Sequence, residues 1–246
     1  LRRAFAVGCI VYGVGSTTTR PSAENVRAIT SAALVSAGSG HTCAVLADGS
    51  ATCWGYNGVG QLGDGSTTSS TLPVPVAGVS DATAISAGDS TTCTRHASGD
   101  LSCWGNNSSG QLGLGGFAPA STAQLVDVDA ASAVSVGTGH TCALLGDATV
   151  ECWGHNAFGQ LGRGTAQFSA VPVAASQLPP ASMVAAADHT CGVLLDGTVR
   201  CAGNNGHGQL GDGTTTSSES VVEVVGITDA SGVAVGSNHS CARHGD

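Results

Sequence analysis

The cysteines of this 246-residue chain recur at a nearly constant spacing. One series stands at positions 43, 93, 142, 191 and 241, and a second follows ten residues behind it at positions 53, 103, 152 and 201. Self-similarity at a fixed period is the signature of repeat architectures, so this period limits the possible folds more than any other feature. It divides the chain after a degenerate N-terminal partial repeat, residues 1–33, into units 34–83, 84–132, 133–181 and 182–231 and a partial unit 232–246.

Each unit contains short apolar runs that are separated by glycine, proline or Asp-Gly. In the first unit, residues 34–37, 42–46 and 50–54 are expected to be strands, and no unit offers a long helical stripe. Residues 72–79 are expected to be a fourth strand at a sheet edge, because Pro73 and Pro75 cannot donate to an interior ladder. About four short strands per ~50-residue unit are typical of a propeller blade, so we predict an all-β β-propeller of four-stranded blades.

The sequence around the cysteines resembles the repeat of a known family. The first four units carry Cys-Trp-Gly-x-Asn-x-x-Gly-Gln-Leu-Gly-x-Gly, with Ala202 in place of the tryptophan in the fourth, and three of them have His-Thr-Cys ahead of it. This run is similar to the repeat of the regulator of chromosome condensation family of β-propellers, in a cysteine-containing variety that we expect to be bacterial. The resemblance implies four-stranded blades, usually about seven to a ring.

The number of blades stays open, because the chain contains only about five units. The chain is either a fragment of a six- or seven-bladed ring or a closed ring of five blades. In the second case residues 4–13 supply the strand that the hairpin of Cys241 lacks, which removes an unpaired sheet edge. Residues 1–9 also have a faint likeness to the end of an export signal, although the apolar stretch before Cys9 is short.

The paired cysteines are better placed for disulfides than for metal. If Ala47-Asp48-Gly49 forms a three-residue turn, Cys43 and Cys53 face each other with Cα atoms about 4.5–5.5 Å apart, within disulfide range. Structural zinc sites separate paired cysteines by about 2–4 residues, so we predict no metal site. The predicted pairs are Cys43–Cys53, Cys93–Cys103, Cys142–Cys152 and Cys191–Cys201, with Cys9–Cys241 added only if the ring closes.

These disulfides indicate an oxidising compartment, which means a secreted, periplasmic or cell-surface protein. The chain carries a net charge of −9 and contains no lysine, so it is a poor ligand for nucleic acid. No apolar run is long enough to span a membrane. Two runs match the glycine pattern of dinucleotide-binding loops, but no helix follows either of them.

No catalytic constellation was found in the sequence. Histidine recurs just before the first cysteine of a unit, and a residue repeated in this way is expected to bond a neighbouring backbone rather than to catalyse. Asp48, Asp147 and Asp196 stand at hairpin turns, where aspartate bonds its own backbone. We therefore predict that the protein is not an enzyme and binds no cofactor.

The residues that vary between units carry the functional prediction. Loops are where a rigid scaffold places its binding residues, and tyrosine is frequent at binding hot spots. We predict a monomeric, non-catalytic, exported module that recognises a protein or a glycan with loops on one propeller face. The alternatives are an inhibitor of a secreted enzyme and, as the family resemblance implies, a guanine-nucleotide exchange factor for a small GTPase. The candidate binding residues are Tyr56, Val59, Asn106, His155, Phe158, Asn204 and His207.

Overall fold

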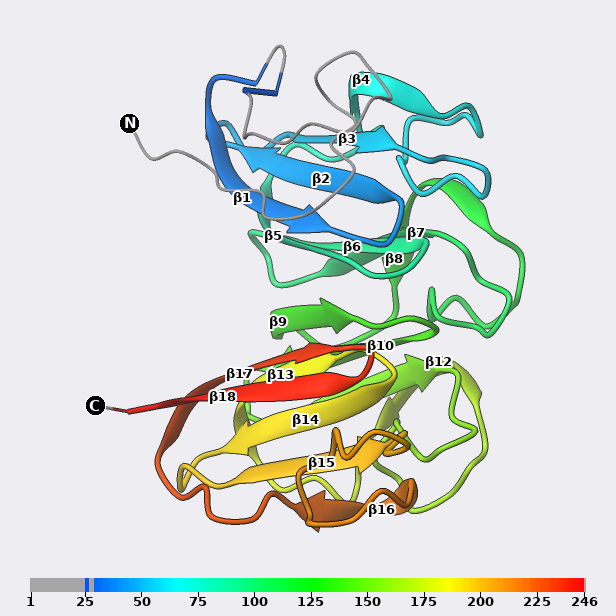
Figure 1. Ribbon diagram of the computed structural model, residues 1–246. Helices are drawn as coiled ribbons and strands as arrows, with labels where there is room; N and C mark the ends of the chain where they lie inside the picture. The colour runs from blue at the N-terminus through cyan, green and yellow to red at the C-terminus, as the bar shows by residue number, and fades with distance from the viewer. Residues whose placement is uncertain (1–24, 27–28, 246) are drawn as a thin grey trace.

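The computed structural model describes residues 25–26 and 29–245 of the chain. These residues form strands and turns without a helix, so the predicted all-β class is confirmed. Four four-stranded sheets follow one another along the chain, and a two-stranded sheet comes last. Figure 1 shows the sheets in succession from β1–β4 at the top to β13–β16 at the bottom, with β17 and β18 in front. We number these sheets as blades one to five.

The strand bounds repeat from blade to blade. Blade one contains β1 (Ala32–Ala37), β2 (His41–Leu46), β3 (Ala51–Gly55) and β4 (Ser70–Pro75). Blade two contains β5 (Ala82–Ala87), β6 (Thr91–His96), β7 (Leu101–Gly105) and β8 (Ala120–Val126). Blade three contains β9 (Ala131–Val136), β10 (His140–Leu145), β11 (Val150–Gly154) and β12 (Ser169–Ala174). Blade four contains β13 (Ala181–Ala186), β14 (His189–Leu194), β15 (Val199–Gly203) and β16 (Ser218–Glu223), and blade five contains β17 (Ala230–Gly236) and β18 (His239–His244).

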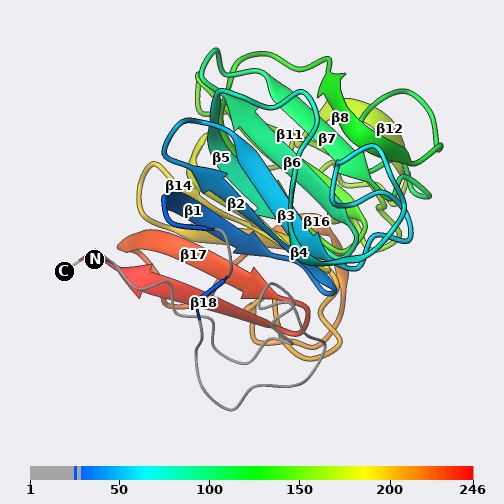
Figure 2. The ribbon, with the colours of Figure 1, turned by 90° about the horizontal axis from the view of Figure 1, so that it is seen from above.

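The strands of each blade pair antiparallel in chain order, from the first strand to the last. The first strands of successive blades contact one another, so they line the inside of the arc, and β4, β8, β12 and β16 are the outermost strands of their sheets. Figure 2 shows β8 and β12 at the edge of the molecule. Among the described residues no sheet joins blade five to blade one, and the arc is open. The predicted N-terminal partial repeat, residues 1–33, lies largely outside the described residues.

The hairpin between β2 and β3 has the predicted register. Gly49 takes a positive φ of 84°, and Leu46 N–H donates to the carbonyl of Ser50 over 2.8 Å. Cys43 therefore lies directly opposite Cys53, and a disulfide joins them with the Cα atoms 4.1 Å apart. This is slightly closer than predicted for facing residues that exchange no backbone hydrogen bonds.

All four predicted hairpin disulfides form, namely Cys43–Cys53, Cys93–Cys103, Cys142–Cys152 and Cys191–Cys201. Cys241 occupies the equivalent position on β18 and has no disulfide partner among the described residues. Cys9 lies outside them, so the bond between Cys9 and Cys241 stays a prediction.

The fourth strand of blade one is an edge strand as predicted, but it is placed differently. It runs from Ser70 to Pro75 rather than over residues 72–79. The chain turns at Gly78, whose φ is +80°, and Val76 and Val79 are buried below the blade instead of extending the strand. Both prolines stay on the sheet edge, where no ladder donor is needed.

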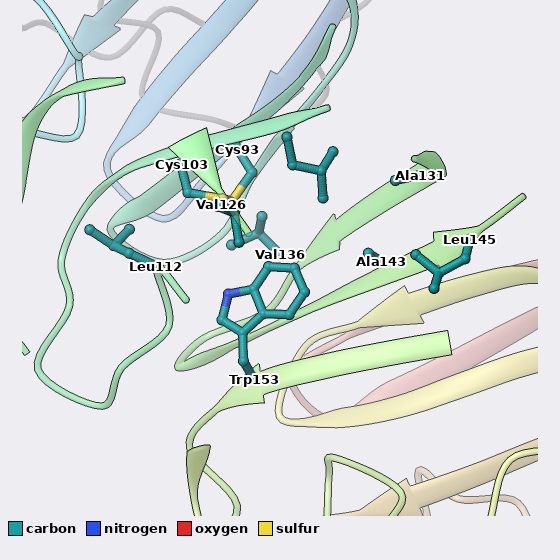
Figure 3. Packing of buried hydrophobic residues seen from close by; sticks show 10 residues of the cluster. Cys93, Cys103, Leu112, Val126, Ala131, Val136, Ala143, Leu145 and Trp153 are labelled. Carbon is teal, nitrogen blue, oxygen red and sulfur yellow. A yellow bond between two sulfur atoms is a disulfide. The ribbon is translucent and has the colours of Figure 1, made fainter. Parts of the chain in front are cut away.

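The hydrophobic core is divided among the contacts between blades. Figure 3 shows the contact between blades two and three, where Trp153 lies beside Val126, Val136 and the disulfide of Cys93 and Cys103. A fully buried tryptophan contributes a large apolar area, which offsets the low aromatic content of 4%. Each blade thus packs against its neighbours rather than around a core of its own.

Candidate binding face

The loops between the third and fourth strands of each blade are built around a buried asparagine. In blade one the Asn57 side-chain oxygen accepts from Leu62 N–H over 2.9 Å, and its amide nitrogen donates to the carbonyls of Ser66 and Thr68 at 3.1 and 3.2 Å. One side chain thus fixes both arms of the loop. The same contacts recur at Asn107, Asn156 and Asn205.

A glutamine closes the tip of each loop. The Gln61 side-chain oxygen accepts from Val59 N–H over 3.2 Å, and Gln160 does the same for Phe158 at 3.0 Å. Gln61 is itself fully buried. The variable residues between asparagine and glutamine are therefore held on a rigid backbone, and this backbone loses little conformational freedom on binding.

The seven predicted binding residues all lie in these loops, at one end of the blades. Tyr56, Phe158 and His207 are exposed, and the other four are half-buried. Tyr56 N–H donates to the carbonyl of Gly40 over 2.8 Å, which holds the ring beside the turn between β1 and β2. Among the described residues, no hydrogen bond, salt bridge or aromatic contact joins candidates of different blades, so their action as one binding site stays a prediction.

Within blade three the structure brings two predicted residues together. The rings of His155 and Phe158 pack edge to face with centroids 6.5 Å apart, and the Gln160 amide lies 2.8 Å from His155 Nδ1. The histidine ring is thereby oriented, and Phe158 remains 42% exposed beside it. This pair places the exposed Phe158 ring against the half-buried imidazole of His155.

A second aromatic pair was missed by the sequence analysis. Phe117 of blade two and Phe168 of blade three pack edge to face with centroids 5.8 Å apart, although the two side chains are 50% and 56% exposed. Thr67 stands where blade two has Phe117. The replacement of a hydroxyl residue by phenylalanine at one repeat position is the signal that could have found this pair.

The recurring histidines are structural, but they bond a side chain rather than a backbone group. His41 Nε2 lies 2.7 Å from Thr92 Oγ1 in the next blade, and that hydroxyl donates to the carbonyl of Gln61 over 3.0 Å. His140 contacts Thr190 and His189 contacts Ser240 in the same way, at 2.7 and 2.6 Å. Each contact joins two successive blades.

Burial sets the charge of these histidines. Loss of solvation lowers the pKa of His41 to about 4, and the nearby Asp89 carboxylate opposes only part of that shift. Burial, with the neighbouring His155 and His189, lowers the pKa of His140 to about 3. Burial likewise lowers the pKa of His189 to about 4. All three imidazoles are therefore neutral at pH 7.

A groove of about 240 Å³ lies beside β18, in the two-stranded sheet of blade five. Its walls include Leu210, Val224 and Val233, with Cys241 at one side. Between blades one and two the equivalent space is filled by Trp104, whose Nε1–H donates to the carbonyl of Gln61 over 2.9 Å, and between blades two and three it is filled by Trp153. The groove therefore lies where the third strand of blades two and three packs its tryptophan against the preceding blade.

Within the described part of the chain, no three His, Cys, Asp or Glu side chains are grouped so that they could hold a metal ion. The same residues include no helix long and apolar enough to cross a bilayer. What the loop end of the blades does offer is rigid backbone carrying aromatic rings, amides and imidazoles, which suits recognition.

Comparison with known proteins gives two kinds of match. The regulator of chromosome condensation (RCC1) repeat model matches residues 32–61, 82–111, 131–160 and 182–209, and a second model of the same repeat matches residues 48–94 and 149–194. Together they span more than half of the chain. No curated protein matches the sequence.

Solved structures share the fold at low sequence identity. Human WBSCR16 is 21% identical with a TM-score of 0.77, over 86% of this chain and 57% of that protein. Prp20p from Saccharomyces cerevisiae, described with its binding to Gsp1p and histones, is 19% identical with a TM-score of 0.77, over 86% and 55%. The ectodomain of the receptor kinase CR4 from Physcomitrella patens is 22% identical with a TM-score of 0.55, over 85% and 48%. The chain spans about half the length of these structures.

Proposed function

The chain belongs to the regulator of chromosome condensation (RCC1) repeat family, and from that premise we propose that it is a non-catalytic module that binds a protein partner with its β3–β4 type loops. Propellers of this family are interaction modules. The loops concerned run from the end of the third strand to the start of the fourth in each blade. We also propose that the protein is exported and that its recognition surface lies on one face of the propeller.

The observation that carries the proposal is the combination of rigid loop backbones with exposed aromatic side chains. Asn57 and its equivalents fix the loops through paired hydrogen bonds, while Tyr56 and Phe158 are 53% and 42% exposed. Aromatic residues on a prearranged backbone are typical hot spots of binding surfaces. A structural purpose alone does not require these side chains to face solvent.

Export is supported by the four hairpin disulfides, which fit an oxidising extracellular environment. The similarity to the ectodomain of a receptor kinase agrees with a propeller that works outside the cell. In this setting the partner is an extracellular protein or a glycan, and one specialised form is the inhibition of a secreted enzyme.

The experiment compares binding by the native chain and a loop variant. Proteins and glycans of the extracellular medium are presented to the immobilised, disulfide-intact chain, and the retained partner is then titrated against Tyr56→Ala/Phe158→Ala. We expect the affinity to fall by about a hundredfold, because two exposed aromatic anchors each contribute about 1–2 kcal/mol or more.

The matched control is Leu195→Ala. Leu195 is 68% exposed and lies at the hairpin tip at the opposite end of blade four. We expect this variant to bind like the native chain. Equal affinity of the native chain and the double loop variant would contradict the proposed recognition face.

A second candidate function comes from the similarity to Prp20p, a structure described with its binding to Gsp1p. It is guanine-nucleotide exchange on a small GTPase. The test is the release of a fluorescent guanine nucleotide from a purified GTPase in the presence of this chain. Release no faster than the spontaneous rate would exclude this function for the GTPase tested.

A further inference from the structure

The outermost strand of each blade exposes one row of backbone groups at the rim of the arc. In blade one, the N–H of Val76, which lies just past β4, donates to the carbonyl of Ala51 on β3. The backbone groups of Val74 and Val76 therefore point inward and bond β3. The alternate residues, Pro73 and Pro75, then direct their backbone away from the sheet. Because proline has no N–H, this edge offers no donor at either position.

In two other outer strands, the residue equivalent to Pro73 also offers no free N–H to an incoming strand. The register places Pro172 of β12 and Val221 of β16 where blade one has Pro73. Pro172 again removes the donor. The N–H of Val221 is already bonded to the Gln177 side-chain oxygen over 3.1 Å. Exposed sheet edges are templates for additional strands, and prolines and caps of this kind prevent such pairing.

Strand β8 lacks these protections. Its outward positions are Ala123 and Leu125, since Cys103 pairs with Gln124 and Leu101 with Val126. Neither N–H has an acceptor among the described residues. Of the outward carbonyls, that of Ala123 accepts only from the exposed Gln124 side chain, at 3.1 Å, which an incoming strand can displace. Of the four outer strands described, β8 alone presents two successive open donors, and Figure 2 shows it at the rim.

The side chains of β8 are suited to contact with another strand. The strand contains no charged residue, in contrast to β16 with Glu219 and Glu223. Leu125 is 66% exposed beside the open donors. An uncharged, apolar edge of this kind gains from being covered, because strand addition removes apolar surface from water and pairs the backbone groups at once.

Charge indicates what would cover the edge. Asp127 and Asp129 are both exposed, follow directly after β8, and form no salt bridge among the described residues. Burial, with the nearby Asp129 and Asp147 carboxylates, raises the pKa of Glu151, so several acidic groups lie near the C-terminal end of β8. Arg95 donates to Thr83 and to the carbonyl of Ala131 instead of compensating these carboxylates.

We propose that the open edge of β8 binds an extended segment of a partner protein that carries basic residues, and that this segment adds a fifth strand to blade two. The backbone of the segment bonds Ala123 and Leu125, an apolar residue covers Leu125, and a lysine or arginine lies near Asp127 and Asp129. A second copy of the chain fits less well, because each copy has a net charge of −9 and lacks lysine. This surface is separate from the loop ends proposed above.

The test titrates a short labelled peptide of alternating valine and threonine, with lysine at both ends, into the disulfide-intact full chain. We expect saturable binding by fluorescence anisotropy and slower amide hydrogen exchange at residues 123–126. Ala123→Pro copies the proline of the equivalent position in blades one and three, so the variant should fold. It should lower the affinity by about tenfold or more, because it removes a strand-pairing donor.

The matched control is Ala174→Pro, which places a proline on an outward position of β12 and should leave the affinity unchanged. Asp127→Asn/Asp129→Asn leaves β8 intact and should weaken binding of the lysine peptide, and glutamate in place of both lysines should weaken it as well. The proposal is overturned if the lysine peptide does not bind. It is also overturned if the Ala123→Pro variant binds this peptide as tightly as the native chain does, or if an N-methylated peptide binds as tightly as the unmethylated one. Equal affinities for the lysine and glutamate peptides would overturn it as well. A dimer of the chain that Ala123→Pro dissociates would identify a second copy as the occupant and would also overturn it.

Discussion

The single proton of the Thr92 hydroxyl determines which ring nitrogen of His41 carries a proton. Thr92 Oγ1 donates that proton to the carbonyl of Gln61, so His41 Nε2 must be the donor in its 2.7 Å contact with the hydroxyl. His41 Nδ1 is buried and has no partner among the described residues. A second proton on this ring would find no acceptor, which agrees with a pKa held near 4 by burial.

The pH dependence of stability follows from these histidines. Their pKa values of about 4, about 3 and about 4 in the folded protein lie below the ordinary 6.5, so between those values the unfolded chain binds more protons. We expect the free energy of unfolding to be constant above pH ~7 and to fall as the pH drops from ~6.5 towards ~4, by up to about 1.4 kcal/mol per pH unit for each histidine. Urea unfolding at a series of pH values measures this slope.

The control for this slope is His140→Thr, which copies the residue that blade two carries at Thr91. The variant should be less stable at pH 7 but should lose stability less steeply between pH ~6.5 and ~4, by the contribution of one proton. The turn aspartates act at lower pH, because hydrogen bonds from Ser50 lower the pKa of Asp48, and Asp147 is similar. An unchanged slope in His140→Thr would contradict the assignment.

Sequence reasoning at the residue scale reached the role of these histidines but not their partners. A histidine repeated in nearly every unit indicates a structural purpose. The hydroxyl of Thr92, however, comes from the following blade, 51 residues away. The fixed period contains no information on which faces of two successive blades meet, so the contact could be found only in three dimensions.

At the scale of elements, the tryptophan after the second cysteine joins neighbouring blades. Trp104 is fully buried, and its Nε1–H donates to the carbonyl of Gln61 over 2.9 Å. Trp153 makes the same bond to Gln111 at 2.9 Å. Where blade four has Ala202 instead, Leu178 lines the space and leaves a residual cavity of only about 10 Å³. Packing thus compensates for the missing tryptophan of blade four.

We expect Trp104→Ala to lower the free energy of unfolding by about 3–5 kcal/mol, because no larger neighbour fills the space that the indole leaves. Trp104→Phe keeps most of the apolar volume and loses the hydrogen bond to Gln61, so it should cost clearly less, about 1–2 kcal/mol. Equilibrium unfolding in urea measures both. The corresponding pair at Trp153 should behave alike, and equal costs for alanine and phenylalanine would show that packing is not the main contribution.

The hairpins could be predicted in detail, while the outer strands could not. Gly49 and the ten-residue cysteine spacing specify the β2–β3 register through local turn geometry alone. Strand β4 ends earlier than its apolar pattern indicates, because Val76 and Val79 belong to a buried turn. Whether an apolar residue continues a strand or turns beneath the sheet depends on the neighbouring blade, and that information is not local.

At the scale of the whole molecule, repetition of the sequence conceals differences between the blades. Phe117 and Phe168 form an exposed pair across two blades, and Ala123 leaves an edge open that Pro73 and Pro172 close in other blades. Each of these residues differs from the residue at the same repeat position in another blade. The shared residues therefore predict the scaffold, whereas the residues that depart from the repeat mark where the surface of one blade differs from the next.

The last prediction concerns Cys241 and the groove beside β18. The eight hairpin cysteines are almost fully buried and bonded, so alkylation of the unreduced protein should label none of them. Mass analysis of the intact chain counts the labelled thiols. We expect labelling to be limited to Cys9 and Cys241. If neither is labelled and one proteolytic fragment contains both, the segment around Cys9 lies along β18 and fills the groove of about 240 Å³ as a third strand. If both are labelled, the segment around Cys9 is not bonded to β18. A labelled hairpin cysteine would contradict the oxidised, exported state on which the proposed function rests.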